Sequence, residues 1–353
     1  MVVSEPDTNA RDPRVSVVMT VYRDFRFFDA AVESVLGQDF ADLELIIIDD
    51  GNNDPDRFAE AARRDPRIRV LSNPTNVGAA VSANRGIEIA RADIIARLDA
   101  DDLCEPTRIG RQVAALDRDP ALGFVGSAVT LIDENDRPLG IQVMPESDLD
   151  IRWTILFYNP FYHSSVAFRK SLFEGAGRYI PSELISQDHY LWFQMLPLCR
   201  AQNLSEPLVR YRLNTQGLTA TNTVNARART DAIRTRLWED LGLQYDGQDE
   251  AVARDISSFL AGHGITDGAG RLTAYRQLIR PLRPFLAAAG SLPVPPSADD
   301  VARLRQRVLG GIRAFPPAGL RDKLEVAKLL WPISPRTAVA LFTDVVQRKL
   351  RGV

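Results

Sequence analysis

The first hundred residues alternate between short apolar runs and stretches with helical spacing. Runs of aliphatic, mostly β-branched residues predict strands that are buried on both faces. These runs are residues 15–21, 43–48, 68–71 and 93–98. Apolar positions recur at helical spacing between them, over 25–37, 55–64 and 78–90. This alternation predicts a parallel sheet that is covered by helices on both faces and joined by right-handed crossovers.

The pattern changes twice further along the chain. Between about 120 and 215 it becomes mixed, with strands predicted over 122–131, 139–143, 164–168 and 208–213, and helices over 149–157 and 189–198. After about 222 strand patterns nearly vanish, and helices with Pro-rich breaks at 293–296 and near Pro316 are expected. We therefore expect a flexible N-terminus (1–13), an α/β domain (14–220) and a C-terminal helical region (221–353).

Composition narrows the class of protein. A chain of 353 residues suggests about two domains, and the net charge of −3 gives no reason to expect a nucleic-acid partner. Cys104 and Cys199 do not make a disulfide framework, the N-terminus lacks the apolar core of a signal peptide, and no apolar run is long enough to span a bilayer. These features predict a cytoplasmic protein.

Polar clusters stand at the ends of three predicted strands. They are Thr20-Val21-Tyr22, Asp49-Asp50 and Asp99–Asp102. The carboxyl ends of parallel strands lie at one edge of a sheet, where ligands bind in α/β folds. Together the clusters predict a binding site there.

The cluster ARLDADD over 96–102 holds three carboxylates in four positions, Asp99, Asp101 and Asp102. Carboxylates with substrate phosphates are typical ligands of Mg²⁺ and Mn²⁺. The alternative is a solvated acidic turn that caps the next helix, and Asp102 is the member expected to be structural. No Gly-rich phosphate loop follows the first strand, which argues against dinucleotide oxidoreductases and P-loop NTPases.

Asp50 has two interpretations. Its carboxylate can accept hydrogen bonds from the N–H groups of a nucleobase, or it can belong to a turn ahead of Gly51. Asn76 either contributes to the site or caps the following helix. Arg85 suits a phosphate or a base, or is simply solvated.

Asp188 begins a predicted helix, where an aspartate is often an N-cap. The functional alternative is a general base that deprotonates an acceptor hydroxyl. His163 and His189 are further candidate bases that rank below Asp188.

Six segments resemble the family-2 glycosyltransferases, which are inverting enzymes with the GT-A fold. In order they are VSVVMTVY, LELIIIDDGNND, NVGAAVSANRGIEIARADIIARLDADD, NPFYHSSVAFRKSLFEGAGRY, SQDHYLW and LVRYRLN, and they cover about 14–215. The resemblance implies a Rossmann-like, mostly parallel central sheet flanked by helices, with a nucleotide-sugar half (14–105) and an acceptor half (106–220). It also implies transfer of a sugar from a nucleoside diphosphate to a hydroxyl of a glycan or lipid-linked acceptor, as in bacterial polysaccharide synthesis.

The resemblance assigns roles to individual residues. Asp188 matches the catalytic base, Asp101 the direct ligand of Mn²⁺ or Mg²⁺, and Asp99 a donor contact and further metal ligand. The residues expected to bind the nucleotide sugar are Thr20, Tyr22, Asp50, Asn76, Gly78, Arg85 and Asp99. His163 and Arg212 are placed on the acceptor side.

Three positions depart from the family pattern. Thr20 replaces a frequent proline, and Gln187 replaces an acidic neighbour of the base. Asn214 stands where many relatives carry a histidine that can approach the metal. An amide oxygen is a weaker ligand, so metal retention is expected to depend more on the sugar nucleotide.

The C-terminal segment 321–353 combines a net charge of +4 with apolar residues and Trp331. Such a segment suits a peripheral contact with an anionic membrane surface, or a helical pair that packs on the catalytic domain or forms a homodimer. The alternatives to a glycosyltransferase are a nucleotidyltransferase acting on sugar phosphates and a catalytically degenerate sugar-nucleotide-binding subunit.

Overall fold

The computed structural model describes residues 12–52, 54–181, 187–214, 223–245, 252, 255–256, 259–260, 271–292, 295–314 and 320–340. The chain divides into two compact units. The first comprises residues 1–151 and 159–230, and the second comprises 152–158 and 231–353.

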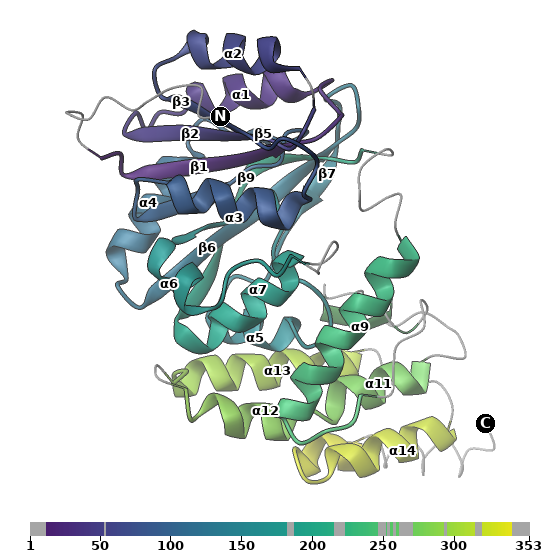
Figure 1. Ribbon diagram of the computed structural model, residues 1–353. Coiled ribbons are helices and arrows are strands. Elements are labelled where there is room, and N and C mark those ends of the chain that lie inside the picture. The colour runs from purple at the N-terminus through teal and green to yellow at the C-terminus, as the bar shows by residue number, and fades with distance from the viewer. Residues whose placement is uncertain are drawn as a thin grey trace. The chain divides into compact units, whose positions relative to one another are not determined.

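A nine-stranded mixed sheet forms the centre of the first unit (Figure 1). Its order is β3-β2-β1-β4-β8-β6-β9-β5, with β7 paired to β6. The strands are β1 (Val15–Val21), β2 (Leu43–Asp49), β3 (Ile68–Ser72), β4 (Ile94–Arg97), β5 (Leu103–Cys104), β6 (Leu122–Ile132), β7 (Pro138–Gln142), β8 (Ala167–Arg169) and β9 (Arg200–Arg212). Strands β1 to β4 are parallel to one another, as predicted, whereas β8 runs antiparallel to β4 and β6.

Helices cover both faces of the parallel half. The helices of this unit are α1 (Phe28–Leu36), α2 (Pro55–Arg64), α3 (Ala79–Ile89), α4 (Arg108–Arg118), α6 (Lys170–Gly175), α7 (Gln187–Met195) and the first part of α5 (Asp148–Thr154). The unit includes α5 up to residue 151. Helices α1, α2 and α4 bury apolar side chains in one core with alternate residues of β1. Helix α3 packs on the opposite face at Gly86, where an added Cβ would lie 2.6 Å from Val18 Cγ1. The α/β GT-A fold is thus confirmed.

Three predicted elements differ in their bounds. The strand expected at 164–168 is a 3-10 turn, η1 (His163–Ser165), followed by β8. Residues 196–198, expected to end a helix, form the 3-10 turn η2 (Leu196–Leu198), because Pro197 cannot continue an α-helix. Strand β9 begins at Arg200, eight residues before the expected start, because β6 supplies a parallel partner along its length.

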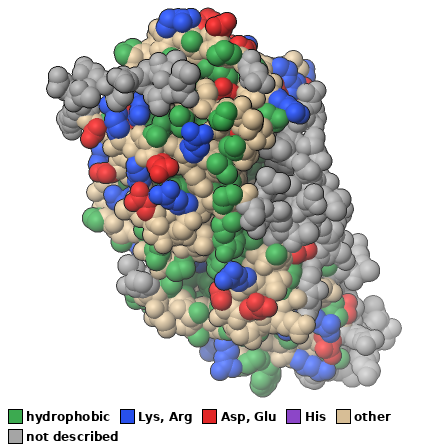
Figure 2. Space-filling model, viewed as in Figure 1, with side chains coloured by type: hydrophobic (Ala, Val, Ile, Leu, Met, Phe, Trp, Pro, Cys, Tyr) green, Lys and Arg blue, Asp and Glu red, His purple; other side chains and the backbone are tan. Residues whose placement is uncertain are grey.

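The surface of the first unit carries both signs of charge. Figure 2 shows Lys and Arg side chains interspersed with Asp and Glu around the parallel half of the sheet. Several form exposed ion pairs, such as Arg64 with Asp29 at 2.8 Å and Arg111 with Glu206 at 2.8 Å.

The second unit is helical. It contains part of α9 (Thr223–Asp240), α11 (Arg271–Ile279), α12 (Leu282–Ala289), α13 (Ala298–Ala314) and α14 (Leu320–Leu330). The segment 152–158 belongs to its core: the Trp153 ring lies 5.2 Å from Phe285, and the Trp238 indole donates to the Leu156 carbonyl. The helical C-terminal region is thus confirmed, although the sequence pattern does not indicate that 152–158 belongs with it.

Helix α14 buries its apolar face within the second unit. Val326 and Leu330 are fully buried, whereas Trp331 is 59% exposed just beyond the helix. Residues 341–353, which carry much of the basic and apolar character noted above, lie outside the described residues. No helix among the described residues is long and apolar enough to cross a membrane.

Candidate functional site

The ends of β1, β2 and β4 lie at the same edge of the sheet. The register pairs Val21 of β1 with Asp49 of β2, and Val18 of β1 with Arg97 of β4. The three polar clusters that follow these strands therefore emerge on one side of the molecule, as the alternating pattern predicts.

A pocket of about 550 Å³ opens beside the end of β1. It lies between the loop after β1 and the loop after β3, and its lining includes Tyr22, Phe25, Asn52, Pro74, Thr75 and Asn76. Tyr22 is 39% exposed, and the Arg23 guanidinium lies 4.7 Å from the centre of its ring. An exposed aromatic ring at a pocket of this size offers a stacking surface for a planar ligand.

Asp50 holds the loop that forms one wall of this pocket. Its Oδ1 accepts hydrogen bonds from Asn73 Nδ2 at 2.8 Å and Val77 N at 2.9 Å. Its Oδ2 accepts from Asn76 Nδ2 at 2.8 Å and Gly78 N at 3.0 Å. These four donors use the acceptor capacity of a carboxylate, so a nucleobase could reach Asp50 only by displacing one of them.

Asn76 and Arg85 both contribute hydrogen bonds to the loop around Asp50. Asn76 does not cap α3, whose N-cap is Gly78, and its amide binds Asp50 instead. Arg85 donates to Asn73 Oδ1 and thereby adjoins the same loop. Thr20 is half-buried in β1, opposite Ile48.

Asp99 lies among buried polar side chains. Arg97 Nη2 is 3.3 Å from Asp99 Oδ1, and His163 Nδ1 is 3.6 Å from Oδ2. Burial favours the protonated carboxyl, but His163 and Arg97 outweigh this effect and hold the pKa of Asp99 below its usual range. The side chain remains 36% exposed, so an ionised carboxylate is accessible at this position.

His163 lies beside Asp99 and the buried Tyr179 hydroxyl. Its Nε2 lies 2.8 Å from the Tyr179 hydroxyl and accepts from Arg97 Nε at 3.3 Å. Because the same ring adjoins Asp99, His163 links the acidic cluster to Tyr179, and its expected place on the acceptor side stays a prediction.

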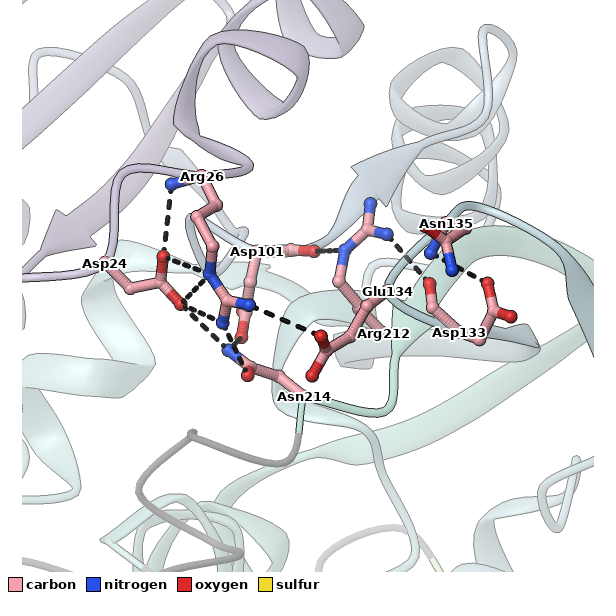
Figure 3. A network of polar contacts seen from close by, with 8 residues as sticks. All are labelled: Asp24, Arg26, Asp101, Asp133, Glu134, Asn135, Arg212 and Asn214. Carbon is pink, nitrogen blue, oxygen red and sulfur yellow. Dashed lines mark hydrogen bonds and ion pairs between the residues drawn. The ribbon is translucent and has the colours of Figure 1, made fainter.

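Asp101 takes part in a network that joins three segments of the chain (Figure 3). Asn214 Nδ2 donates to Asp101 Oδ2 at 3.0 Å and to Asp24 Oδ2 at 3.3 Å. Arg26 donates to Asn214 Oδ1 at 3.1 Å and forms an ion pair with Asp24 at 2.7 Å. Asn214 thus presents a donor to Asp101, and its oxygen faces Arg26. In this arrangement the amide oxygen of Asn214 accepts from Arg26, and the expected role of Asn214 as a metal ligand stays a prediction.

Arg212 is buried and holds the backbone around the acidic cluster. It is 3% exposed, its Nε donates to the Asp101 carbonyl at 2.8 Å, and its Nη1 donates to the Asp133 carbonyl at 2.9 Å. The guanidinium also stacks 4.0 Å above the Phe27 ring. These contacts fix the backbone of the acidic cluster against the β6–β7 turn, and the expected acceptor-side place of Arg212 stays a prediction.

Asp102 is structural, although it does not cap a helix. Helix α4 begins at Arg108 after the N-cap Thr107, whereas Asp102 Oδ1 accepts from Arg212 N at 2.7 Å. Burial, with the charges of Asp101 and Asp99, raises the pKa of Asp102 well above its usual range. Burial, with the charges of Asp99 and Asp24, also raises the pKa of Asp101, although Asn214 opposes this effect.

The described residues contain no group of three or more His, Cys, Asp or Glu side chains that could hold a metal ion. Asp99 and Asp101 nevertheless offer two carboxylates on one short loop, and Mg²⁺ or Mn²⁺ is commonly bound by one or two carboxylates and completed by substrate phosphates. The donor set therefore fits a metal that binds together with a phosphorylated ligand.

Asp188 lies in the first turn of α7 and is half-buried. Its Oδ2 accepts a hydrogen bond from Asn159 Nδ2 at 2.7 Å. The buried Tyr179 hydroxyl interacts with the charges of both Asp188 and Asp99, and these charges add to burial in raising the pKa of Tyr179. The Tyr179 hydroxyl also lies 2.8 Å from His163 Nε2, and the His163 ring adjoins Asp99.

The sequence interpretation missed several of these residues. Arg97, which is 1% exposed, could have been recognised from the sequence, because a charged residue inside a predicted buried strand needs specific partners. No sequence pattern marks Asn159, Asp24 or Arg26, because their roles arise from contacts between distant segments.

The family comparison matches the N-terminal part of the chain. A family model described as "Glycosyl transferase family 2" matches residues 16–174. The putative glycosyltransferase EpsE of Bacillus subtilis is 32% identical over 209 residues, which cover 57% of this chain and 73% of that protein. The O-antigen biosynthesis glycosyltransferase WbnJ of Escherichia coli is 30% identical over 208 residues, which cover 57% of this chain and 80% of that protein.

Two solved structures share the fold at low sequence identity. S. aureus TarS 1–349 in complex with UDP-GlcNAc is 14% identical, with a TM-score of 0.51 over 96% of this chain and 92% of that one. The mannosyltransferase PcManGT from Pyrobaculum calidifontis, in complex with GDP-Man and Mn²⁺, is 15% identical, with a TM-score of 0.50 over 97% and 89%.

Proposed function

This chain belongs to glycosyltransferase family 2, and from that premise we propose that it transfers a sugar from a nucleoside-diphosphate donor to a hydroxyl group, with inversion and with the help of a divalent metal. The acceptor is a glycan or a lipid-linked saccharide. Relatives named for O-antigen and amylovoran biosynthesis support an acceptor of this class.

The donor nucleotide lies in the pocket beside β1. Tyr22 stacks against the base, and the loop held by Asp50 forms the opposite wall. Thr20, Asn76, Gly78 and Arg85 are the remaining candidate donor contacts. A nucleotide sugar is supported by the UDP-GlcNAc and GDP-Man complexes of the two structural neighbours, and the pocket itself is compatible with either nucleotide.

Asp99 and Asp101 hold the metal together with the donor diphosphate. When bound, Mn²⁺ or Mg²⁺ neutralises the charge that develops on the departing diphosphate. This assignment is supported by the exposed, ionised Asp99, by the carboxylate of Asp101 beside it, and by the Mn²⁺ in the mannosyltransferase complex.

Asp188 acts as the general base. It removes the proton from the acceptor hydroxyl while that oxygen attacks the anomeric carbon from the face opposite the diphosphate. One carboxylate is sufficient for a single displacement with inversion. The observation that carries this proposal is geometric: Asp99 and Asp101 follow β4 at the edge of the sheet where β1 and β2 also end, and the half-buried Asp188 is held by Asn159 at 2.7 Å in the same unit.

The test combines donor binding with turnover. The thermal shift caused by UDP-GlcNAc and GDP-mannose is measured with and without Mn²⁺, and release of the free nucleotide is then followed. We expect one donor to stabilise the protein only with metal. Asp101→Asn should abolish that shift, whereas Asp188→Asn should keep the shift and lose turnover. Glu206→Gln, an exposed carboxylate paired with Arg111, is the matched control. Wild-type turnover in both site variants would refute the proposal.

A further inference from the structure

The candidate base Asp188 has an amide partner with a fixed orientation. Asn159 Nδ2 donates to Asp188 Oδ2 at 2.7 Å, and Asn159 Oδ1 accepts from Phe161 N at 3.2 Å. A flipped amide would place its oxygen against the carboxylate and its nitrogen against the Phe161 N–H. Both contacts would then be repulsive, so the donor is locked toward Asp188.

The backbone next to Asn159 is held by the sheet. Asn203 of β9 donates from Nδ2 to the Pro160 carbonyl at 3.0 Å. Gly126 of β6 makes this close approach possible, because a Cβ there would lie 2.6 Å from the Phe161 ring and would also collide with Asn203. Asn159 is therefore placed by the scaffold before any substrate binds.

An aromatic cluster couples the same segment to the helix that carries Asp188. The Phe161 ring lies 4.9 Å from the Phe124 ring and 6.0 Å from the Trp192 ring. Trp192 is one turn after Asp188 on α7, and it also stacks on Phe124 at 5.5 Å. Both ends of the hydrogen bond between Asn159 and Asp188 are thus attached to one buried cluster, which limits their relative movement.

We propose that Asn159 is the positioning residue of the base: it engages Oδ2 of Asp188, so that Oδ1 faces the acceptor hydroxyl. This inference rests on the proposed function. As the acceptor O–H bond breaks, its proton passes to Oδ1. The acceptor oxygen forms the bond to the anomeric carbon, and the carbon–oxygen bond to the diphosphate breaks, with its electron pair leaving on the diphosphate. Asn159 keeps its own protons throughout and sets the direction in which Asp188 reacts.

The surroundings of Asp188 define the controls that a test needs. Asn159 and the adjacent Gln187 are neutral. The titratable neighbours among the described residues include His189, which is next in α7, and Tyr179, whose hydroxyl interacts with the Asp188 charge. Tyr179 in turn interacts with Arg97 and Asp99. A carboxylate introduced at residue 159 would be the nearest new charge, at the 2.7 Å separation of the present hydrogen bond.

The experiment compares Asn159→Ala, Asn159→Asp and Asp188→Asn, with Gln202→Ala as an exposed amide control. The assay is nucleotide release from UDP-GlcNAc or GDP-mannose, whichever donor binds, with water as the acceptor. We expect Asn159→Ala to lower kcat about ten- to a hundredfold while the donor-induced thermal shift is kept. In Asn159→Asp, the acidic limb of the pH–rate profile should move up by about one pH unit or more, because two adjacent carboxylates cannot both ionise readily.

The outcomes separate the two proposals. Loss of turnover in Asp188→Asn with wild-type kcat and an unmoved acidic limb in both Asn159 variants would overturn the positioning role alone. Full turnover in Asp188→Asn would overturn the proposed base itself. If Asn159→Ala fails to fold, the near-isosteric Asn159→Asp still decides the matter through kcat measured above its acidic limb. An ionised aspartate cannot donate to Asp188, so we expect a lowered plateau, and a wild-type plateau would overturn the positioning role.

Discussion

Asp50→Asn should destabilise the donor pocket before any donor binds. The substitution keeps the shape of the side chain but replaces one acceptor oxygen by an NH₂ group. Each Asp50 oxygen accepts one hydrogen bond from an asparagine side chain and one from a backbone N–H. Whichever way the new amide turns, two of these four bonds are lost and two donors then face the NH₂ group.

The magnitude follows from that count. Hydrogen bonds to a buried charged group contribute about 1.5–3 kcal/mol each, so the loss of two corresponds to about 3–6 kcal/mol before the loop relaxes. Asp50 is 2% exposed, which limits replacement of the lost partners by water. Since domains unfold with only about 5–15 kcal/mol, the variant should be visibly unstable.

Urea unfolding of the donor-free protein measures this loss, and hydrogen exchange at the Val77 and Gly78 amides locates it. We expect exchange to accelerate at these amides and the donor-induced thermal shift to shrink. Asp54→Asn is the matched control: Asp54 caps α2 by accepting from Arg57 N, and asparagine is an equally good N-cap. An unfolding free energy within about 1 kcal/mol of wild type, with altered preference between UDP-GlcNAc and GDP-mannose, would refute this reasoning and favour direct base contact.

Two further predictions concern stability and membranes. Burial opposes ionisation of Glu44, but hydrogen bonds from Ser16, Arg91 and Arg69 outweigh this effect and lower the pKa of Glu44. A carboxyl group whose pKa is lower in the native state than in the unfolded state stabilises the fold at a pH above its unfolded pKa. This stabilisation is lost as the pH falls through the native pKa. Glu44→Gln should therefore cost about 3 kcal/mol at pH 7 and progressively less in urea titrations toward pH 3, and a pH-independent cost would contradict this account. If 321–353 contacts anionic membranes, Trp331→Ala should reduce flotation with anionic vesicles, and equal flotation would argue against contact at this exposed side chain.

The parallel half of the sheet could be predicted because its strands have a single, uniform environment. Every residue of β2 is buried, and so are all but one of β1, so their apolar runs are unambiguous. The strand expected at 164–168 lacked this clarity. There Ser165 donates to the Tyr162 carbonyl, and the Ser164 hydroxyl accepts from Asp99 N. The bond within 162–165 is local and favours a turn over strand pairing, whereas the bond to Asp99 comes from a distant segment. An apolar pattern reveals neither of them.

The candidate site could be predicted as a set of strand ends but not as a set of contacts. That Asp50, Asp99 and Asp101 lie at one edge follows from topology alone. The orientation of an amide does not, because it is fixed by partners that are distant in sequence: Asn214 is turned by Arg26, 188 residues away. For the same reason, the buried tasks of Arg212 and His163 could not be inferred from their positions in the chain.

The distribution of charge around the acidic cluster supports the proposal that metal and donor bind together. Arg97 partly compensates Asp99, and the raised pKa of Asp102 favours its neutral form. Asp101 has only the neutral amide of Asn214 as a side-chain donor among the described residues, and its raised pKa reflects burial near other carboxylates. A divalent cation would relieve this uncompensated charge. Because the described residues supply few further ligands, the remaining coordination has to come from the phosphates of the donor.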